Sequence, residues 1–76
     1  MKEKFENLEK AARAHNESTG DFGPLNCLLN ARTNADDTFS HNELHPDYWR
    51  VATGSIADTE QSPAIIAWFK SNGHLI

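Results

Sequence analysis

The sequence predicts an all-α fold, a small bundle of three to four short helices. Apolar residues recur at spacings of three and four over several segments, which is the period of an amphipathic helix. Gly-Pro, Ser-Pro and Asn-Gly pairs stand where such segments begin or end, as helix start and stop signals do. A chain of 76 residues has no room for two domains, so we expect one domain over residues 1–76.

The first predicted helix covers residues 2–16. Glutamate precedes a basic residue by four positions twice, and each such pair stabilises a helix by roughly 0.2–0.5 kcal/mol. Weak helix formers and a glycine follow at residues 16–20 and end the helix. The apolar stripe that we expect to face the core is Met1, Phe5, Leu8, Ala12 and His15.

The second predicted helix covers residues 24–33. Asp21 or Gly23 can cap it, and Pro24 suits the first helical position because a proline needs no N–H partner there. The polar run at residues 33–38 is predicted to be a loop. The apolar residues expected to face the core are Phe22, Leu25, Leu28 and Leu29.

The third predicted helix covers residues 46–57. Ser40 and Glu43 before it match the capping-box pattern of a short turn. Pro46 disfavours helical geometry at the preceding residue and then opens the helix. Gly54 costs this helix on the order of 1 kcal/mol, so a small hairpin that turns at residues 53–55 is the alternative. The expected apolar side is Tyr48, Trp49, Ala52 and Ile56.

The last predicted helix covers residues 63–72, between a Ser62-Pro63 start and an Asn72-Gly73 stop. Apolar residues occupy more than half of its circumference, and such a helix either lies centrally or shares one side with a partner. We therefore expect a homodimer with Trp68 or Phe69 near its centre. Leu75 and Ile76 are expected to fold back after the glycine.

Charge and composition exclude several classes of function. The formal net charge is −4, and residues 21–60 carry a net charge of −5. Nucleic-acid binding needs clustered Lys and Arg side chains, which the chain lacks, so a nucleic-acid partner is not expected. The longest apolar run, residues 64–69, is far shorter than the ~20 residues of a membrane span. A single cysteine without an apolar leader is typical of a cytoplasmic protein.

Few residues have the spacing that chemistry requires. His41, Glu43, His45 and Asp47 are the densest group of potential metal ligands, but Glu43 stands midway between the histidines, which matches neither the zincin pattern nor its inverse. We expect no metal site there; the alternative is metal-dependent activity at His41, Glu43 and His45. Cys27 lies on an amphipathic helix, where a cysteine usually acts as a small core residue. No catalytic set and no cofactor are predicted.

The function predicted from these observations is non-enzymatic protein binding, by a small inhibitor, adaptor or regulator of bacterial or phage origin. Its acidic middle segment suits a partner with a basic surface, and Tyr and Trp are frequent anchors of protein interfaces. The expected contact residues are Tyr48, Trp49, Trp68, Phe69, Asp36, Asp37, Glu43 and Asp47.

The alternative function is a DNA-binding regulator that uses residues 46–73. The segment 65–70 resembles the recognition helix of small phage repressors, in which an aliphatic residue precedes a tryptophan by three positions. That family places its turn glycine about six residues before the aliphatic position, whereas Gly54 lies eleven before Ile65. Arg50 and Lys70 are the only cations of this stretch, which is few for phosphate contacts.

Overall fold

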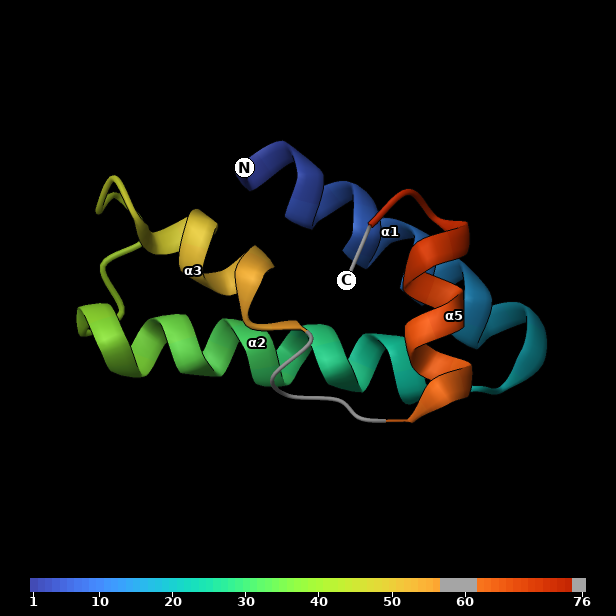
Figure 1. Ribbon diagram of the computed structural model, residues 1–76. Coiled ribbons are helices and arrows are strands. Elements are labelled where there is room, and N and C mark those ends of the chain that lie inside the picture. Colours follow the sequence, from blue (N-terminus) through green and yellow to red (C-terminus); the bar gives the residue numbers. More distant parts are fainter. Residues whose placement is uncertain (57–61, 75–76) are drawn as a thin grey trace.

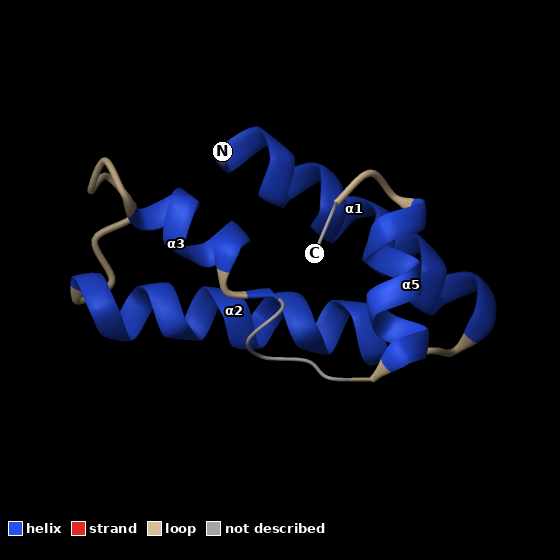
Figure 2. Cartoon of the chain, viewed as in Figure 1, coloured by secondary structure: helices blue, strands red, loops and turns tan. Residues whose placement is uncertain are grey.

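The computed structural model describes residues 1–56 and 62–74, and it confirms the all-α prediction. The described residues contain helices and connecting turns and no strand (Figures 1 and 2). The helices are α1 (Lys2–Thr19), α2 (Gly23–Phe39), α3 (Tyr48–Gly54) and α5 (Pro63–Ser71).

Helix α2 packs against each of the other three described helices, α1, α3 and α5. Helix α1 also contacts α3. Figure 1 shows α3 over the C-terminal half of α2 and α5 crossing its N-terminal end, so α3 and α5 lie at opposite ends of the molecule. The close approach of α5 to the start of α2 involves Gly23, beside which lies the Ile65 side chain.

Helix α1 follows the predicted stripe for most of its length. Phe5, Leu8 and Ala12 are buried, as expected, whereas Met1 is exposed, and the prediction is wrong for that residue. The helix ends at Gly20, which adopts a left-handed conformation (φ 76°) and donates its N–H to a carbonyl of the last turn. It is three residues longer than predicted, and the hydroxyl of its last residue, Thr19, donates to a carbonyl of the preceding turn over 2.7 Å.

Helix α2 is longer than predicted, and the polar loop expected at residues 33–38 is wrong. The helix continues because Ala31 and Ala35 extend its buried stripe. The hydroxyls of Thr33 and Thr38 donate to carbonyls four residues earlier, so these side chains are satisfied inside the helix. Two residues expected in the core, Phe22 and Leu29, are instead exposed on the outer side.

Helix α3 is a helix and not the alternative hairpin, but it begins at Tyr48 rather than at residue 46. The predicted capping box at Ser40 is also wrong. Ser40 ends α2 in a left-handed conformation (φ 52°), and Glu43 pairs with Arg32 of α2 instead of reaching back to the turn. Residue 57, the predicted end of this helix, lies outside the described residues.

Helix α5 has nearly its predicted bounds, and Ser62 and Gly73 flank it as expected. Phe69 has no exposed surface, and Ile65, Ile66 and Trp68 are half-buried. Ile65 and Trp68 pack against the core cluster, whereas Ile66 is not among the residues that do, so part of the apolar side of this helix remains exposed. The homodimer stays a prediction, and a position for Phe69 at its centre is excluded in this conformation. Leu75 and Ile76 lie outside the described residues.

One buried cluster joins the four described helices. The cluster consists of Phe5, Leu8, Ala12, Leu25, Cys27, Leu28, Ala31, Ala35, Tyr48, Ala52, Ile56 and Phe69.

No helix among the described residues combines the length and apolar character that crossing a membrane requires.

Candidate interaction surface

The turn between α2 and α3, residues 40–47, is a well-braced connection. Ser40 and His41 both adopt positive φ angles, 52° and 61°, which reverse the chain after α2. The His41 N–H donates to the carbonyl of Asp36 over 2.9 Å, and four further backbone hydrogen bonds of 3.0–3.1 Å link residues 39–48. Backbone groups that are paired in this way hold the turn in one conformation.

Side chains brace the same turn. The side-chain oxygen of Asn42 accepts the backbone N–H of Leu44 over 3.1 Å, and Nδ1 of His45 accepts that of Asp47 over 3.1 Å. The His45 ring also stacks on Phe39, with 4.3 Å between the ring centroids. Short local hydrogen bonds of this kind are how Asn and Asp side chains fix turns.

Leu44 stands at the tip of this braced turn with 93% of its surface exposed. No other large hydrophobic residue among the described ones is exposed to this degree. Single surface leucines are common, but this one combines near-complete exposure with a backbone that is held on both sides. The turn therefore presents an apolar side chain at a defined position.

Below the turn, a polar network joins α2 to α3. The Tyr48 hydroxyl donates to Asp36, and Arg32 hydrogen-bonds to Glu43. Burial of the hydroxyl, and then the Asp36 carboxylate, raise the pKa of Tyr48 to about 12. Tyr48 therefore stays protonated and donating over the whole physiological range.

Trp49 lies beside this network and is half-buried. Its ring packs against Phe5 and Tyr48, with centroid distances of 5.4 and 4.8 Å. The Arg32 guanidinium lies 5.4 Å and the Lys2 ammonium 6.0 Å from its centroid, within the range of a cation–π contact. The structure thus uses Trp49 to join α1, α2 and α3.

The structure brings five of the eight predicted contact residues together at the α2–α3 connection. Two predicted residues, Trp68 and Phe69, lie on α5 at the other end of α2 (Figure 1). There the Trp68 ring packs against the His15 ring, with 5.7 Å between the ring centroids. Asp37 is exposed on the last turn of α2. The five residues at the connection are Asp36, Glu43, Asp47, Tyr48 and Trp49.

Two aromatic predictions need correction. Tyr48 and Phe69 have no exposed surface, so neither is available to a partner in this conformation. The physical reason is the size of the domain, because a short chain needs its largest side chains to form a core. Leu44 was not predicted as a contact residue, and its sequence signal was an isolated leucine within an otherwise polar turn.

The carboxylates at this end are mostly paired within the chain. Asp36 lies 3.5 Å from His41, Asp47 lies 3.2 Å from Arg50, and Glu43 pairs with Arg32. The surface is therefore less acidic than the composition of residues 21–60 indicates. Asp37 remains the exposed carboxylate for which the structure gives no ion pair among the described residues.

The potential metal ligands of the turn are engaged separately. His41 faces Asp36, Glu43 faces Arg32, and His45 stacks on Phe39, so the three side chains do not converge. Within residues 1–56 and 62–74, no three His, Cys, Asp or Glu side chains form a group that could hold a metal. Cys27 lies in the core, where its thiol donates to the carbonyl of Ile56 over 3.5 Å.

The segment proposed for DNA binding forms two helices, α3 and α5. Residues 57–61 between them lie outside the described residues. Arg50 pairs with Asp47, which reduces its positive charge toward a phosphate. No protein-family model, curated protein or solved structure matches this chain.

Proposed function

We propose that the protein is a non-enzymatic binding module, a small inhibitor, adaptor or regulator that acts on another protein. Its contact surface is the turn tip, defined here as Asp37, Glu43, Leu44 and Asp47. The observation that carries the proposal is the 93% exposure of Leu44 on a turn with a braced backbone.

Energetics favour this tip as an anchor. Burying a leucine side chain gains on the order of 1.5–3 kcal/mol, and the turn is already ordered, so little conformational entropy opposes binding. Glu43 and Asp47 lie near Leu44 in the chain but pair with Arg32 and Arg50, which leaves Asp37 as the carboxylate of the tip with no ion pair among the described residues. The complementary partner is a protein with a small apolar pocket that has a Lys or Arg side chain at its border.

The test begins with capture of partners on immobilised protein from a lysate of the source organism, with identification by mass spectrometry. Affinity for the purified partner is then measured by calorimetry. We expect Leu44→Ser to weaken binding about tenfold or more, which corresponds to ~1.4 kcal/mol. Leu29→Ser is the matched control, because Leu29 is a partly exposed leucine at the border of the buried face of α2 and lies outside the turn tip.

Equal affinities of the two leucine variants would refute the turn tip as the contact surface. Charge gives a second criterion: Asp37→Asn should slow association at low salt and have little effect at high salt. Tight binding of a DNA duplex at physiological salt, lost in Lys70→Ala, would instead support the helix-turn-helix alternative over residues 46–73.

A further inference from the structure

The turn that follows α5 is built around a buried histidine. Gly73 adopts a left-handed conformation (φ 84°) and donates its N–H to the carbonyl of Lys70 over 3.2 Å. The His74 N–H donates to the carbonyl of Phe69 over 2.9 Å. These two bonds form a Schellman motif. In this motif the two residues joined by the longer hydrogen bond, here Phe69 and His74, commonly also make a side-chain contact. Here that contact is the His74 ring against the edge of Phe69, 6.1 Å between centroids.

The imidazole of His74 is buried in a way that suits only its neutral form. The residue is 8% exposed, and its Nδ1 atom is buried without a hydrogen-bond partner among the described residues. Neutral Nδ1 can leave an acceptor lone pair unused, but protonated Nδ1 becomes a charged donor with nothing to receive its hydrogen. A buried charge without a partner is strongly unfavourable.

The charged groups around His74 increase this preference. Helix α1 presents the Lys4 ammonium, which repels a protonated imidazole. Helix α5 contributes the Phe69 ring and backbone carbonyls, and the structure gives no ion pair to His74 among the described residues. Burial lowers the pKa of His74 below its ordinary value, and Lys4 lowers it further.

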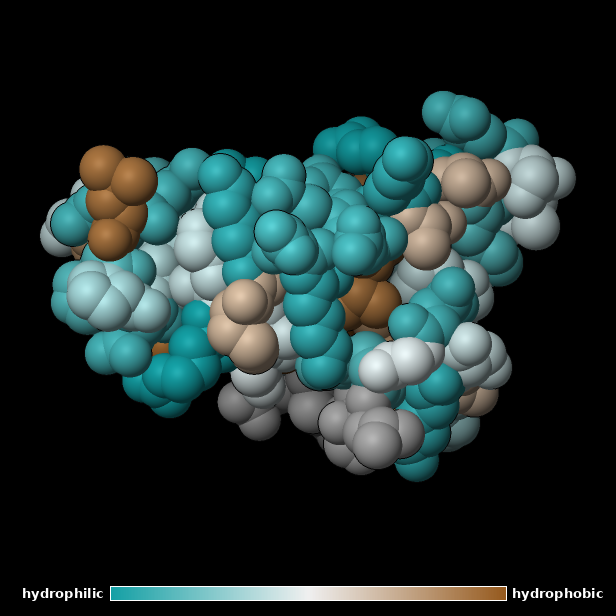
Figure 3. All heavy atoms as spheres, turned by 90° about the horizontal axis from the view of Figure 1, so that it is seen from above, coloured by the Kyte–Doolittle hydropathy of each residue, from teal (hydrophilic) through white to brown (hydrophobic). Residues whose placement is uncertain are grey.

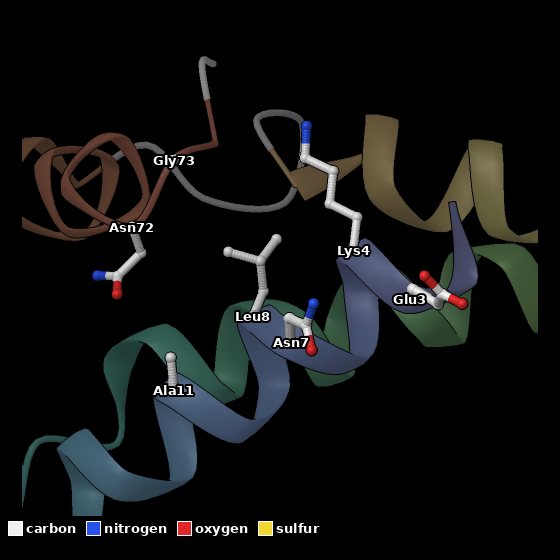
Figure 4. Close-up of a pocket in the computed structure, with 7 residues that line it drawn as sticks. All are labelled: Glu3, Lys4, Asn7, Leu8, Ala11, Asn72 and Gly73. Carbon is white, nitrogen blue, oxygen red and sulfur yellow. The ribbon is translucent and has the colours of Figure 1, made fainter.

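A hollow separates this turn from α1. It has a volume of about 470 Å³ and is lined by Glu3, Lys4, Asn7, Leu8, Ala11, Asn72 and Gly73. Figure 4 shows Leu8 and Ala11 of α1, and Asn72 just after α5, directed toward this hollow, with Lys4 at its edge. Displacement of the turn would enlarge the hollow and expose Phe69 and Leu8, both of which are buried now.

We propose that His74 is a proton-sensitive latch, which holds the turn of residues 72–74 folded back on Phe69, across the hollow from α1, when neutral and releases it when protonated. Release uncovers an apolar surface between α1 and α5 that is hidden at neutral pH. The latch is independent of the turn tip, which lies at the opposite end of α2.

The direction of the pH dependence follows from the position of the pKa. The folded chain binds the proton of His74 less readily than the unfolded chain does. The contribution of the neutral imidazole to stability is therefore complete above the ordinary histidine value of 6.5 and is lost as the pH falls below it. Acidification should open the turn first, because its few hydrogen bonds and contacts are local.

Nuclear magnetic resonance of the full chain tests the latch. We expect the His74 imidazole to titrate below 6.5. The amide hydrogen-exchange protection factors of Gly73 and His74 should fall several-fold between pH 7.5 and 5.5, and about tenfold is the upper limit that one histidine with an ordinary pKa of 6.5 allows. Amides in the middle of α2, such as Ala31, should keep their protection.

His74→Phe and His74→Gln cannot take up the proton, and both should abolish the acid-dependent loss at Gly73. His41→Asn removes an exposed histidine and should leave that loss unchanged.

Three results would overturn the latch. One is titration of His74 at or above its ordinary value. Another is full protection of the Gly73 and residue-74 amides at pH 5.5. The last is an unchanged acid-dependent loss in both position-74 variants, which would assign the opening to other groups.

Discussion

Left-handed residues end three of the helices, and one of them is not a glycine. Gly20 and Gly73 adopt φ angles of 76° and 84° after α1 and α5, where the missing Cβ removes the steric cost. Ser40 adopts the same region after α2, and His41 follows it there. For a residue with a Cβ, this conformation costs roughly 1–2 kcal/mol of steric energy. The braced turn that presents Leu44 is therefore locally strained.

Substitution at Ser40 measures that strain. We expect Ser40→Gly to raise the free energy of unfolding by about 0.5–1 kcal/mol, because glycine adopts the left-handed conformation at no steric cost but is more flexible when unfolded. Ser40→Ala removes the same hydroxyl and keeps the Cβ, so it should bring no gain. Urea denaturation of both variants gives the comparison. Equal effects of Gly and Ala would show that the backbone conformation is not the origin.

At the scale of elements, the sequence predicts those helix ends that local chemistry sets. The end of α1 near Gly20 and both ends of α5 depend on a glycine or a Ser-Pro pair, and each lies within three residues of its prediction. Such signals act through the backbone of one or two residues and need no knowledge of the tertiary structure.

The C-terminal half of α2 could not be predicted in the same way. Thr33 and Asp36 are weak helix formers, and a local reading makes them loop residues. They are helical because α3 packs on Ala31 and Ala35, and because Asp36 receives the Tyr48 hydroxyl from α3. These contacts join residues that are distant in the sequence, and tertiary packing of this kind overrides propensity.

The candidate surface was predictable in composition and not in geometry. The acidic residues do gather at the α2–α3 connection, but a Ser40–Glu43 capping box was expected where Glu43 in fact pairs with Arg32. Whether an aromatic side chain is core or surface depends on which helices cover it, and Tyr48 became core for that reason. The exposure of Leu44 likewise follows from the path of the turn.

The contact between α2 and α5 makes a prediction at the same scale. A Cβ on Gly23 would lie 2.8 Å from the terminal methyl of Ile65. We expect Gly23→Ala to destabilise the protein by about 1–2 kcal/mol through displacement of α5. The cost should be smaller in an Ile65→Val background, which lacks that methyl, and a double-mutant cycle in urea measures the coupling.

Gly54 supplies the matched control for Gly23. It is also a helical glycine, but no atom of the described residues outside its own helix and its chain neighbours lies within 4 Å of its Cβ position. Gly54→Ala should therefore stabilise the protein by roughly 0.5–1 kcal/mol, the ordinary helix preference for alanine. If Gly23→Ala were equally stabilising, α5 would not pack against α2 in solution as it does here.

At the scale of the whole molecule, a single buried cluster packs together the four helices of the described residues. Its members come from each of them, and α2 supplies more than any of the other three. Figure 3 shows hydrophobic groups that are scattered among hydrophilic ones on the face in view rather than gathered in one large patch. The cohesion of the fold on this view comes from the interior, and a small interior leaves little reserve stability.

Two adjacent leucines of α2 test how much of that stability the interior supplies. Leu28 is 1% exposed and touches the core, whereas Leu29 is 39% exposed on the outer side. By typical values of 0.05–0.15 kcal/mol per residue, a chain of this length has a free energy of unfolding of roughly 4–11 kcal/mol. Leu28→Ala removes buried methyl groups and leaves a cavity, at a cost of about 2–5 kcal/mol, so it should shift the urea midpoint strongly or unfold the protein. Leu29→Ala changes the same chemistry on the same helix and should cost less than about 1 kcal/mol. Similar midpoints for the two variants would mean that α2 is rotated about its axis relative to this structure, and with it the surface that carries the turn tip.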